Sequence, residues 1–191
     1  MAGLGDLHNR LHGRLWHTTR PDRVSAIIAA KALLVEPDID NAERWKTSRG
    51  PEYYPFVRMI GGVSLFDFRD FDANHYCNSH PMSSWQVFVP YVKSWAGSVW
   101  FEVDISSVAD RFVSGDELVN QWDTGGHFRH TIMPRIEAAH IGNLPISAFC
   151  SAFMTWSDGR QVREFDVPDF KQAQFERIYQ EWEASFPVVG Q

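Results

Sequence analysis

Cysteine is scarce in this sequence. Among 191 residues there are only two, Cys77 and Cys150, and no Cys-x-x-Cys pair is present. A disulfide framework and a cysteine-based zinc site are therefore excluded as the basis of the fold. Two isolated cysteines also suit a reducing compartment better than an oxidising one, which favours an intracellular protein.

Positive charge is in short supply as well. The chain has 18 Lys and Arg against 24 Asp and Glu, so its net charge is −6 at pH 7. Proteins that bind nucleic acid over a broad surface normally present a basic face, so the composition excludes that class. A local basic patch remains compatible with this composition.

Long apolar runs are missing too. No stretch approaches the roughly 18 consecutive apolar residues that a membrane crossing needs. The N-terminal segment MAGLGDLHNRLHGRL lacks the continuous apolar centre of a signal peptide. We therefore expect a cytoplasmic protein with no membrane partner.

Several enzyme signatures are absent from the chain. These are the phosphate-binding loop GxxxxGK[ST], the dinucleotide fingerprint GxGxxG, the nucleophile elbow GxSxG and the metalloprotease motif HExxH. Candidate functional residues must therefore be found in weaker patterns.

The chain does have a high hydrophobic and aromatic content. Hydrophobic residues make up 44% of it, with eight Trp and fourteen Phe, which is enough for one well-packed core. We expect a single domain over residues 1–191, with a core at about 14–157 and a C-terminal helix at 168–186. The predicted elements follow no regular βαβ alternation, which indicates an α+β fold. Strands are predicted at 14–17, 59–66, 97–105, 132–141, 144–146 and 148–156, and a helix is predicted to begin at Pro21.

Three short segments combine polar side chains with the end or the centre of a predicted strand. The first is Trp16-His17-Thr18-Thr19, which leads into the helix that Pro21 begins. The second is Gly61-Gly62-Val63-Ser64-Leu65-Phe66, followed by Tyr76. In the third, Glu137 precedes Gly142-Asn143-Leu144-Pro145.

In this order, the three segments resemble the ADP-ribosyltransferase superfamily, particularly its His-containing branch. That branch comprises the poly-ADP-ribose polymerases, the tRNA 2′-phosphotransferases and the DarT-type toxins. The resemblance covers most of residues 15–146. It implies a split β-sheet core with peripheral helices and a C-terminal helix, and NAD-dependent mono-ADP-ribosyltransferase activity that releases nicotinamide. NAD is then the substrate, and no metal is expected.

The resemblance also implies roles for individual residues. Glu137 is the expected catalytic carboxylate, which stabilises an oxocarbenium-like transition state. The expected NAD-binding residues are His17, Thr18, Thr19, Gly62, Ser64 and Tyr76. Ser64 departs from the family pattern, because a Tyr usually stands there and stacks on nicotinamide. Phosphotransferases also hold a 2′-phosphate with basic residues, for which Arg20, Arg23 and Arg58 are candidates without a motif match.

Within the family, the loop before the catalytic Glu selects the acceptor. Here this loop is predicted at 123–130, and Arg129 and Arg135 are the candidate acceptor-binding residues. An Arg at position 135, two residues before Glu137, argues against modification of arginine side chains. The acceptor is expected to be a macromolecule, either nucleic acid or protein, and an antitoxin or other inhibitor protein is a further partner that the resemblance allows.

The same residues also fit two roles outside catalysis by this family. Glu137 is equally expected on the solvent side of an alternating strand, and His17 as a residue that stabilises a turn. The chain is then a catalytically inactive module of the same fold that binds a nucleotide or a protein.

A third alternative is a hydrolase built on His127, His130 and His140, for which a metal site would need further ligands.

Overall fold

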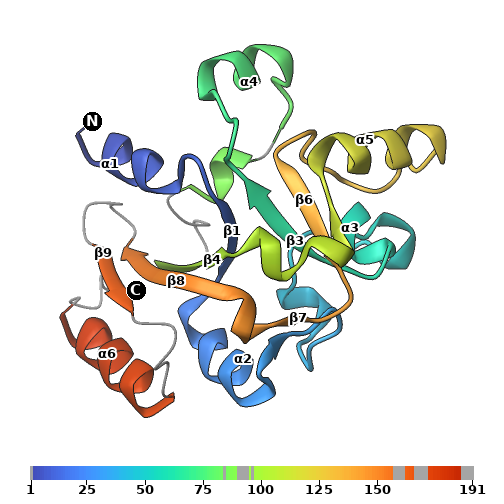
Figure 1. The fold of residues 1–191 in the computed structure, drawn as a ribbon. Coiled ribbons are helices and arrows are strands. Elements are labelled where there is room, and N and C mark those ends of the chain that lie inside the picture. Colours follow the sequence, from blue (N-terminus) through green and yellow to red (C-terminus); the bar gives the residue numbers. More distant parts are fainter. Residues whose placement is uncertain are drawn as a thin grey trace.

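The computed structural model describes residues 2–83, 85–89, 95, 97–156, 162–165 and 172–185. Its centre is an antiparallel sheet of seven strands in the order β5-β6-β3-β1-β4-β8-β9, and β2 and β7 form a separate two-stranded sheet (Figure 1). Helices cover this sheet on both sides, which confirms the α+β class.

The strands are β1 (Leu15–Thr19), β2 (Ala32–Leu33), β3 (Gly62–Asp67), β4 (Gly97–Val103), β5 (Phe112–Val113), β6 (Glu137–Ile141), β7 (Leu144–Pro145), β8 (Phe149–Trp156) and β9 (Val162–Phe165). The α-helices are α1 (Ala2–Leu11), α2 (Val24–Ala30), α3 (Phe56–Met59), α4 (Ala73–Ser79), α5 (Gly115–Thr124) and α6 (Gln172–Ser185).

The large sheet is split between β1, its central strand, and the neighbouring strand β3. β1 pairs with β4 at four positions, but it pairs with β3 at only two, Leu15 with Asp67 and Trp16 with Phe66. The pairing stops where His17 begins, so the two halves of the sheet, β5-β6-β3 and β1-β4-β8-β9, open from each other there. This opening positions the candidate site.

Each face of the sheet carries its own hydrophobic cluster. On one face, the apolar side chains of alternating strand residues such as Leu15, Leu65 and Phe101 pack against α2 and α6. On the other face, Trp16, Phe66 and Trp100 form an aromatic cluster that Leu7 and Leu11 of α1 help to cover. Successive side chains of a strand point to opposite faces of the sheet, so alternate residues of the same strand contribute to the two clusters.

Several predicted elements differ in their bounds from those observed, and three of the differences bear on the site. The strand predicted at 132–141 is regular only from Glu137 onward, because Pro134 and Arg135 form a turn in which Arg135 has a left-handed φ of 63°. The strand predicted at 59–66 begins at Gly62, since the preceding residues form α3. The loop predicted from residue 123 begins only after Thr124, because α5 continues to that residue and has its C-cap at Gly125.

The C-terminal helix is present as α6, and its buried Phe175 and half-buried Tyr179 pack on the sheet. Residues 168–171 and 186 of the predicted helix lie outside the described residues. The N-terminal helix α1 was not predicted, although Leu4, Leu7 and Leu11 have the three- and four-residue spacing of a helix face. None of the helices in the described part of the chain has the length and apolar run of a membrane span.

Candidate active site

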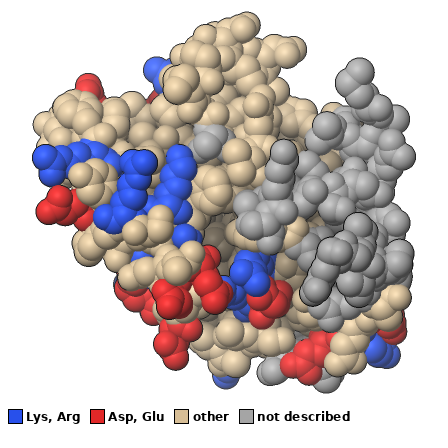
Figure 2. Space-filling model, turned by 180° about the vertical axis from the view of Figure 1, so that it is seen from behind, with Lys and Arg blue, Asp and Glu red and all other residues tan. Residues whose placement is uncertain are grey.

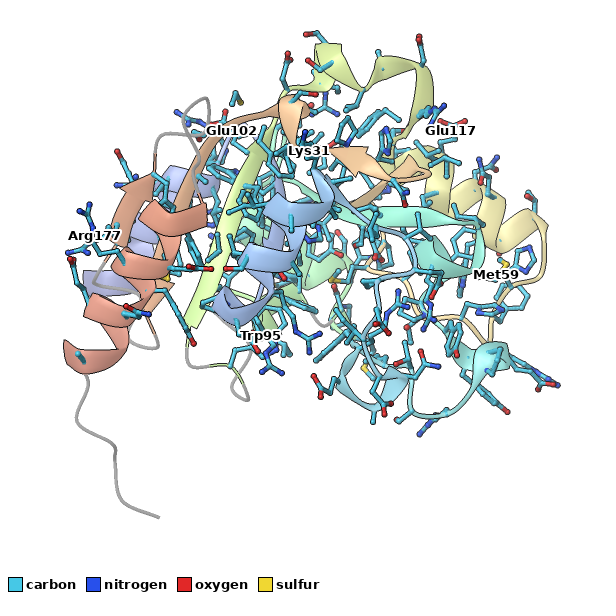
Figure 3. All side chains as sticks on the ribbon, turned by 90° about the horizontal axis from the view of Figure 1, so that it is seen from below. Lys31, Met59, Trp95, Glu102, Glu117 and Arg177 are labelled. Atoms are coloured by element: carbon cyan, nitrogen blue, oxygen red, sulfur yellow. The ribbon has the colours of Figure 1, made fainter. Side chains whose placement is uncertain are left out.

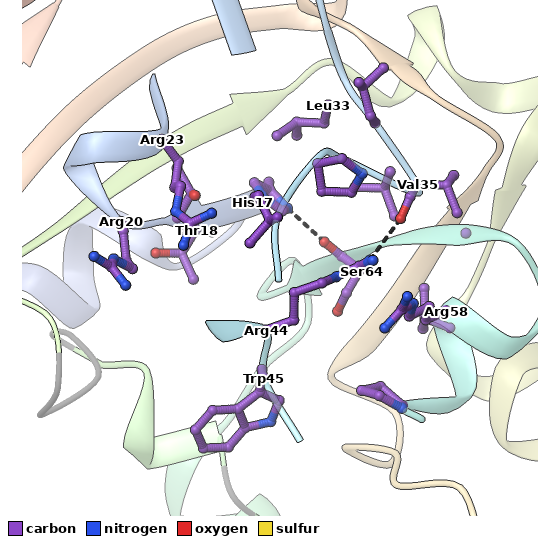
Figure 4. Close-up of a pocket in the computed structure, with 18 of the residues that line it drawn as sticks. His17, Thr18, Arg20, Arg23, Leu33, Val35, Arg44, Trp45, Arg58 and Ser64 are labelled. Carbon is purple, nitrogen blue, oxygen red and sulfur yellow. Dashed lines mark hydrogen bonds between the residues drawn. The ribbon is translucent and has the colours of Figure 1, made fainter. Parts of the chain in front are cut away.

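A cavity of about 550 Å³ opens at the split in the sheet (Figure 4). Its walls come from β1, α2, the loop after β2, α3, β3, the segment before β6, and Glu137 at the start of β6. Small-molecule sites in proteins commonly enclose about 300–1,000 Å³, so the cavity has the size of a ligand site.

His17 bridges the two halves of the sheet at the edge of this cavity. Its Nδ1 lies 2.9 Å from the carbonyl oxygen of Ser64, across the opening between β1 and β3 (Figure 4). A carbonyl only accepts, so Nδ1 carries the proton and donates it. Burial lowers the pKa of His17 to about 4, which keeps the ring neutral at pH 7. Nε2 is therefore unprotonated and able to accept a hydrogen bond.

Ser64 also holds the carboxylate of Glu137. The Ser64 hydroxyl donates to Glu137 Oε1 at 2.7 Å, and the backbone N–H of Met133 donates to Oε2 at 2.9 Å. Ser64 pairs with Ala139 in the sheet, so Glu137 is its diagonal neighbour on the same face of β6. Each carboxylate oxygen is thus fixed by its own donor.

Glu137 is 4% exposed, and burial raises the pKa of its carboxyl above the ordinary value. The hydrogen bonds from Ser64 and Met133 act in the opposite direction, and so does the positive charge of Lys46. Lys46 is exposed, in the loop between β2 and α3. These three contributions favour the ionised form of the carboxyl group, whereas burial favours the protonated form.

Two pairs of arginines line the cavity, one on each side of the split (Figure 4). Arg20 and Arg23 follow β1, and their partners are Asp22 and Glu43. Arg44 and Arg58 lie on the side of β3, and they share Glu36. Lys and Arg side chains also lie beside Asp and Glu on the face that Figure 2 shows.

Aromatic side chains form one end of the cavity. Trp45, Phe66, Phe88 and Trp95 are among its lining residues, as are Met133 and Glu137. The ring of Trp45 packs edge-on against Phe88, with 4.7 Å between their centroids. The ring of Trp95 also packs edge-on against Phe88, with 6.4 Å between their centroids. A flat apolar group in this end of the cavity would therefore meet aromatic rings.

Tyr76 lies elsewhere. It is buried in α4, where its ring packs against Phe71 and its hydroxyl lies 3.0 Å from the Ser83 hydroxyl. Burial raises the pKa of Tyr76 to about 12, and the negative charge of Glu137 contributes to the increase. It is not among the residues that line the cavity, because the start of α4, capped by Asp72, directs this side chain into the aromatic cluster.

The remaining predicted NAD-binding residues are near His17 or Ser64. Thr19 and Gly62 line the cavity. Thr18 lines it as well, but its hydroxyl donates to the carbonyl of Val99 at 3.3 Å and is satisfied within the sheet. A Cβ on Gly62 would lie 3.0 Å from the Val57 side chain, so a glycine here lets α3 pack closely on β3.

The two predicted acceptor-binding arginines lie on the surface outside the cavity lining. Arg129 is 72% exposed and pairs with Glu52 at 3.4 Å. Arg135 is 68% exposed and pairs with Asp116 at 3.3 Å. The segment that carries them reaches the cavity through Thr131, Ile132 and Met133. The structure therefore connects this loop to Glu137 without placing its arginines in the cavity.

The three histidines considered for a hydrolase have different hydrogen-bond or ring partners, although the rings of His127 and His130 also meet edge-on with 6.1 Å between their centroids. His130 Nδ1 lies 2.8 Å from the Tyr54 carbonyl, and His140 Nδ1 lies 3.2 Å from the Gly142 carbonyl. His127 packs on Phe56. Within the described ranges, no group of three or more His, Cys, Asp or Glu is arranged to hold a metal ion.

Comparison with known proteins gives little at the level of sequence. No protein-family model matches the chain, and no curated protein matches it. Eleven chains of solved structures do match. One is a double mutant of heat-labile enterotoxin, which is 10% identical over 93% of this chain and 75% of that chain, with a TM-score of 0.43.

Proposed function

We propose that the protein is a NAD-dependent ADP-ribosyltransferase whose catalytic carboxylate is Glu137. The observation that carries the proposal is the hydrogen-bonded series His17–Ser64–Glu137 at the edge of one cavity. The three residues come from the three sequence segments that resemble this superfamily, in the same order. Their meeting at one cavity is what that resemblance requires.

The proposed reaction breaks the bond between C1′ of the nicotinamide ribose and the ring nitrogen. The bonding electron pair goes to that nitrogen, so the cationic pyridinium leaves as neutral nicotinamide. A lone pair of the acceptor forms the new bond to C1′, and the acceptor loses its proton to solvent. Positive charge develops on the sugar in between, and the fixed Glu137 carboxylate stabilises it.

His17 presents a hydrogen-bond acceptor that suits a ribose hydroxyl. With Nδ1–H donated to Ser64, its Nε2 accepts from a sugar hydroxyl. Because the ring is neutral, it adds no positive charge beside a sugar that becomes positive in the transition state. The role of His17 in the proposal is therefore to orient the ribose.

The aromatic end of the cavity is the proposed nicotinamide subsite. Trp45 and Trp95 are half-buried and line the cavity together with Glu137. Stacking against such rings contributes about 0.5–1.5 kcal/mol beyond the area that it buries. They would take the stacking role that the family pattern assigns to tyrosines, because Ser64 has no ring and Tyr76 is packed in the aromatic cluster.

The acceptor is proposed to meet the loop before β6. Arg129 and Arg135 are exposed there, and Met133 of the same segment donates to Glu137. This arrangement suits a macromolecular acceptor whose reactive group enters the cavity while its surface contacts the two arginines. Both nucleic acid and protein fit the proposal. The Arg129→Ala and Arg135→Ala variants should lose acceptor labelling while keeping NAD hydrolysis, and an equal loss of both would contradict this role.

The test is nicotinamide release from NAD by the purified protein, with and without a mixed extract of protein, DNA and RNA. We expect release by the wild type and a loss of about 10²–10³-fold in Glu137→Gln, since it removes charge stabilisation in the transition state. The matched control is Glu117→Gln, which changes an exposed carboxylate on α5 (Figure 3).

The outcomes separate the proposal from its alternative. NAD binding without release in any condition would indicate a catalytically inactive binding module. Neither binding nor release would exclude both. Labelling that depends on the extract, followed by nuclease or protease treatment, identifies the acceptor class.

A further inference from the structure

Glu36 occupies a cationic site that two arginines build. Its Oε1 accepts from Arg58 Nε at 2.8 Å. Its Oε2 accepts from Arg58 Nη2 at 2.7 Å and from Arg44 Nη1 at 2.5 Å. Two guanidinium groups thus converge on one carboxylate, which is a geometry that a phosphate group can also fill.

The arginines are fixed, whereas the carboxylate is on the solvent side. The side chains of Arg44 and Arg58 are 16% and 12% exposed, and that of Glu36 is 58% exposed. The arginines also have anchors other than Glu36. Arg44 Nη2 donates to the Val35 carbonyl at 2.8 Å, and Arg58 Nη1 donates to Asn41 Oδ1 at 2.9 Å.

Arg58 has a second anchor besides Asn41, because its guanidinium lies over the ring of Tyr54 at 3.9 Å from the centroid. Removing Glu36 from this site would therefore leave both guanidinium groups in place. The site is preorganised for an anion, and the anion that it holds now is an exposed part of the same chain.

This pair is separate from Arg20 and Arg23. Those two arginines have their own carboxylates, Asp22 and Glu43, and lie beside Thr18 in Figure 4. A dinucleotide's two phosphates are joined through one oxygen, so they occupy one cationic subsite. A cavity that needed to bind only this diphosphate would leave the other arginine pair without a use.

We propose that Arg44 and Arg58 form a second phosphate subsite, which Glu36 occupies until a ligand phosphate displaces it. This rests on the proposed function, and it assigns the diphosphate of NAD to the other pair of cavity-lining arginines, Arg20 and Arg23. The phosphate of the second subsite comes from one of two sources. It is the 2′-phosphate of a phosphorylated dinucleotide, or it is a phosphate of the acceptor.

The first experiment measures inorganic phosphate binding by calorimetry in the absence of nucleotide. Glu36→Gln removes the competing charge and should bind phosphate about tenfold more tightly than the wild type. Arg58→Gln and Arg44→Gln should lose this binding. The gain in Glu36→Gln cannot result from misfolding, and Arg177→Gln on α6 is the matched control, far from α3 in Figure 3.

The second experiment compares NAD with NADP to identify the source. If the dinucleotide supplies the phosphate, the wild type binds NADP more tightly than NAD, and the difference disappears in Arg58→Gln. If the acceptor supplies it, NAD and NADP bind alike, and phosphate binds to NAD-saturated Glu36→Gln as it does to the free protein. Either result supports the subsite.

Three results would overturn the proposal. These are equal phosphate affinity in Glu36→Gln and the wild type, phosphate binding that persists in both arginine variants, and competition between NAD and phosphate in Glu36→Gln. The last would assign the pair to the diphosphate itself. Because phosphate binding is measured without nucleotide, a failure of nicotinamide release would count against the proposed function and leave this result standing.

Discussion

Ser64 and Glu137 lie on neighbouring strands, and the Ser64 hydroxyl donates to the Glu137 carboxylate at 2.7 Å. The backbone carbonyl of the same serine accepts from His17. One residue therefore fixes a carboxylate with its side chain and an imidazole with its main chain. A substitution at position 64 that keeps the backbone separates these two effects.

The first prediction concerns the pH dependence of nicotinamide release. Burial raises the pKa of Glu137 and the Ser64 hydroxyl lowers it, so Ser64→Ala should raise it further. The hydroxyl stabilises the ionised carboxylate, so its loss favours the protonated form. The acidic limb of the pH–rate profile should therefore move to higher pH.

Ser64→Thr keeps the hydroxyl and is the matched variant. It should retain the wild-type limb. An unchanged limb in Ser64→Ala would mean that the carboxylate does not depend on this hydrogen bond for its ionisation.

The second prediction concerns stability in acid. Burial lowers the pKa of His17 to about 4 in the folded protein, against an ordinary value of 6.5. Between pH 6.5 and about 4, His17 binds a proton in the unfolded chain but not in the folded one. The free energy of unfolding therefore falls as the pH drops through this range. The slope from one group is at most about 1.4 kcal/mol per pH unit.

His17→Gln cannot take up this proton. Its free energy of unfolding, measured by urea denaturation between pH 7 and pH 4, should therefore fall less than that of the wild type. Parallel curves for the two proteins would show that His17 titrates normally in the folded state.

The third prediction concerns the aromatic end of the cavity. Trp45→Ala should weaken NAD binding by about two- to tenfold, since one ring stack contributes about 0.5–1.5 kcal/mol. Free nicotinamide should quench the tryptophan fluorescence of the wild type, and less so in this variant. Tyr76→Phe, which loses a hydroxyl outside the cavity lining, should bind NAD as the wild type does. A larger loss in Tyr76→Phe than in Trp45→Ala would mean that NAD binding depends on the Tyr76 hydroxyl more than on the Trp45 ring.

The fourth prediction concerns the turn that leads into β6. A Cβ on Gly115 would lie 2.2 Å from the carbonyl oxygen of Arg135, which is backbone and cannot rotate away. Gly115→Ala should therefore destabilise the protein by about 1–3 kcal/mol, although the same change in a helix usually stabilises it. It should also reduce nicotinamide release, because the turn supplies the Met133 donor to Glu137.

Asn120→Ala on the exposed side of the same helix is the control, and should be neutral or slightly stabilising. Thermal melts of both variants give the comparison. Stabilisation by Gly115→Ala would mean that the helix can move away from the turn without cost.

The sequence identifies cavity-lining residues in regular strands better than those in loops. His17, Ser64 and Glu137 come from three predicted strands, and in the structure they meet at the opening of a split sheet. Trp45, Arg44 and Glu36 were not predicted, because they lie in the irregular segment after β2, where no periodicity relates position to direction. Tyr76 was predicted from its distance after β3, but spacing alone does not fix the direction of a helical side chain.

The split itself affects how the molecule holds together. Only two residue pairs join β1 to β3, so the two halves of the sheet are held together less strongly there than β1 to β4 or β3 to β6. A ligand that contacts His17 on one half and Ser64 or Glu137 on the other adds a connection between the halves. Ligand binding should therefore stabilise the sheet itself, and amide hydrogen exchange along β1 and β3 should become slower.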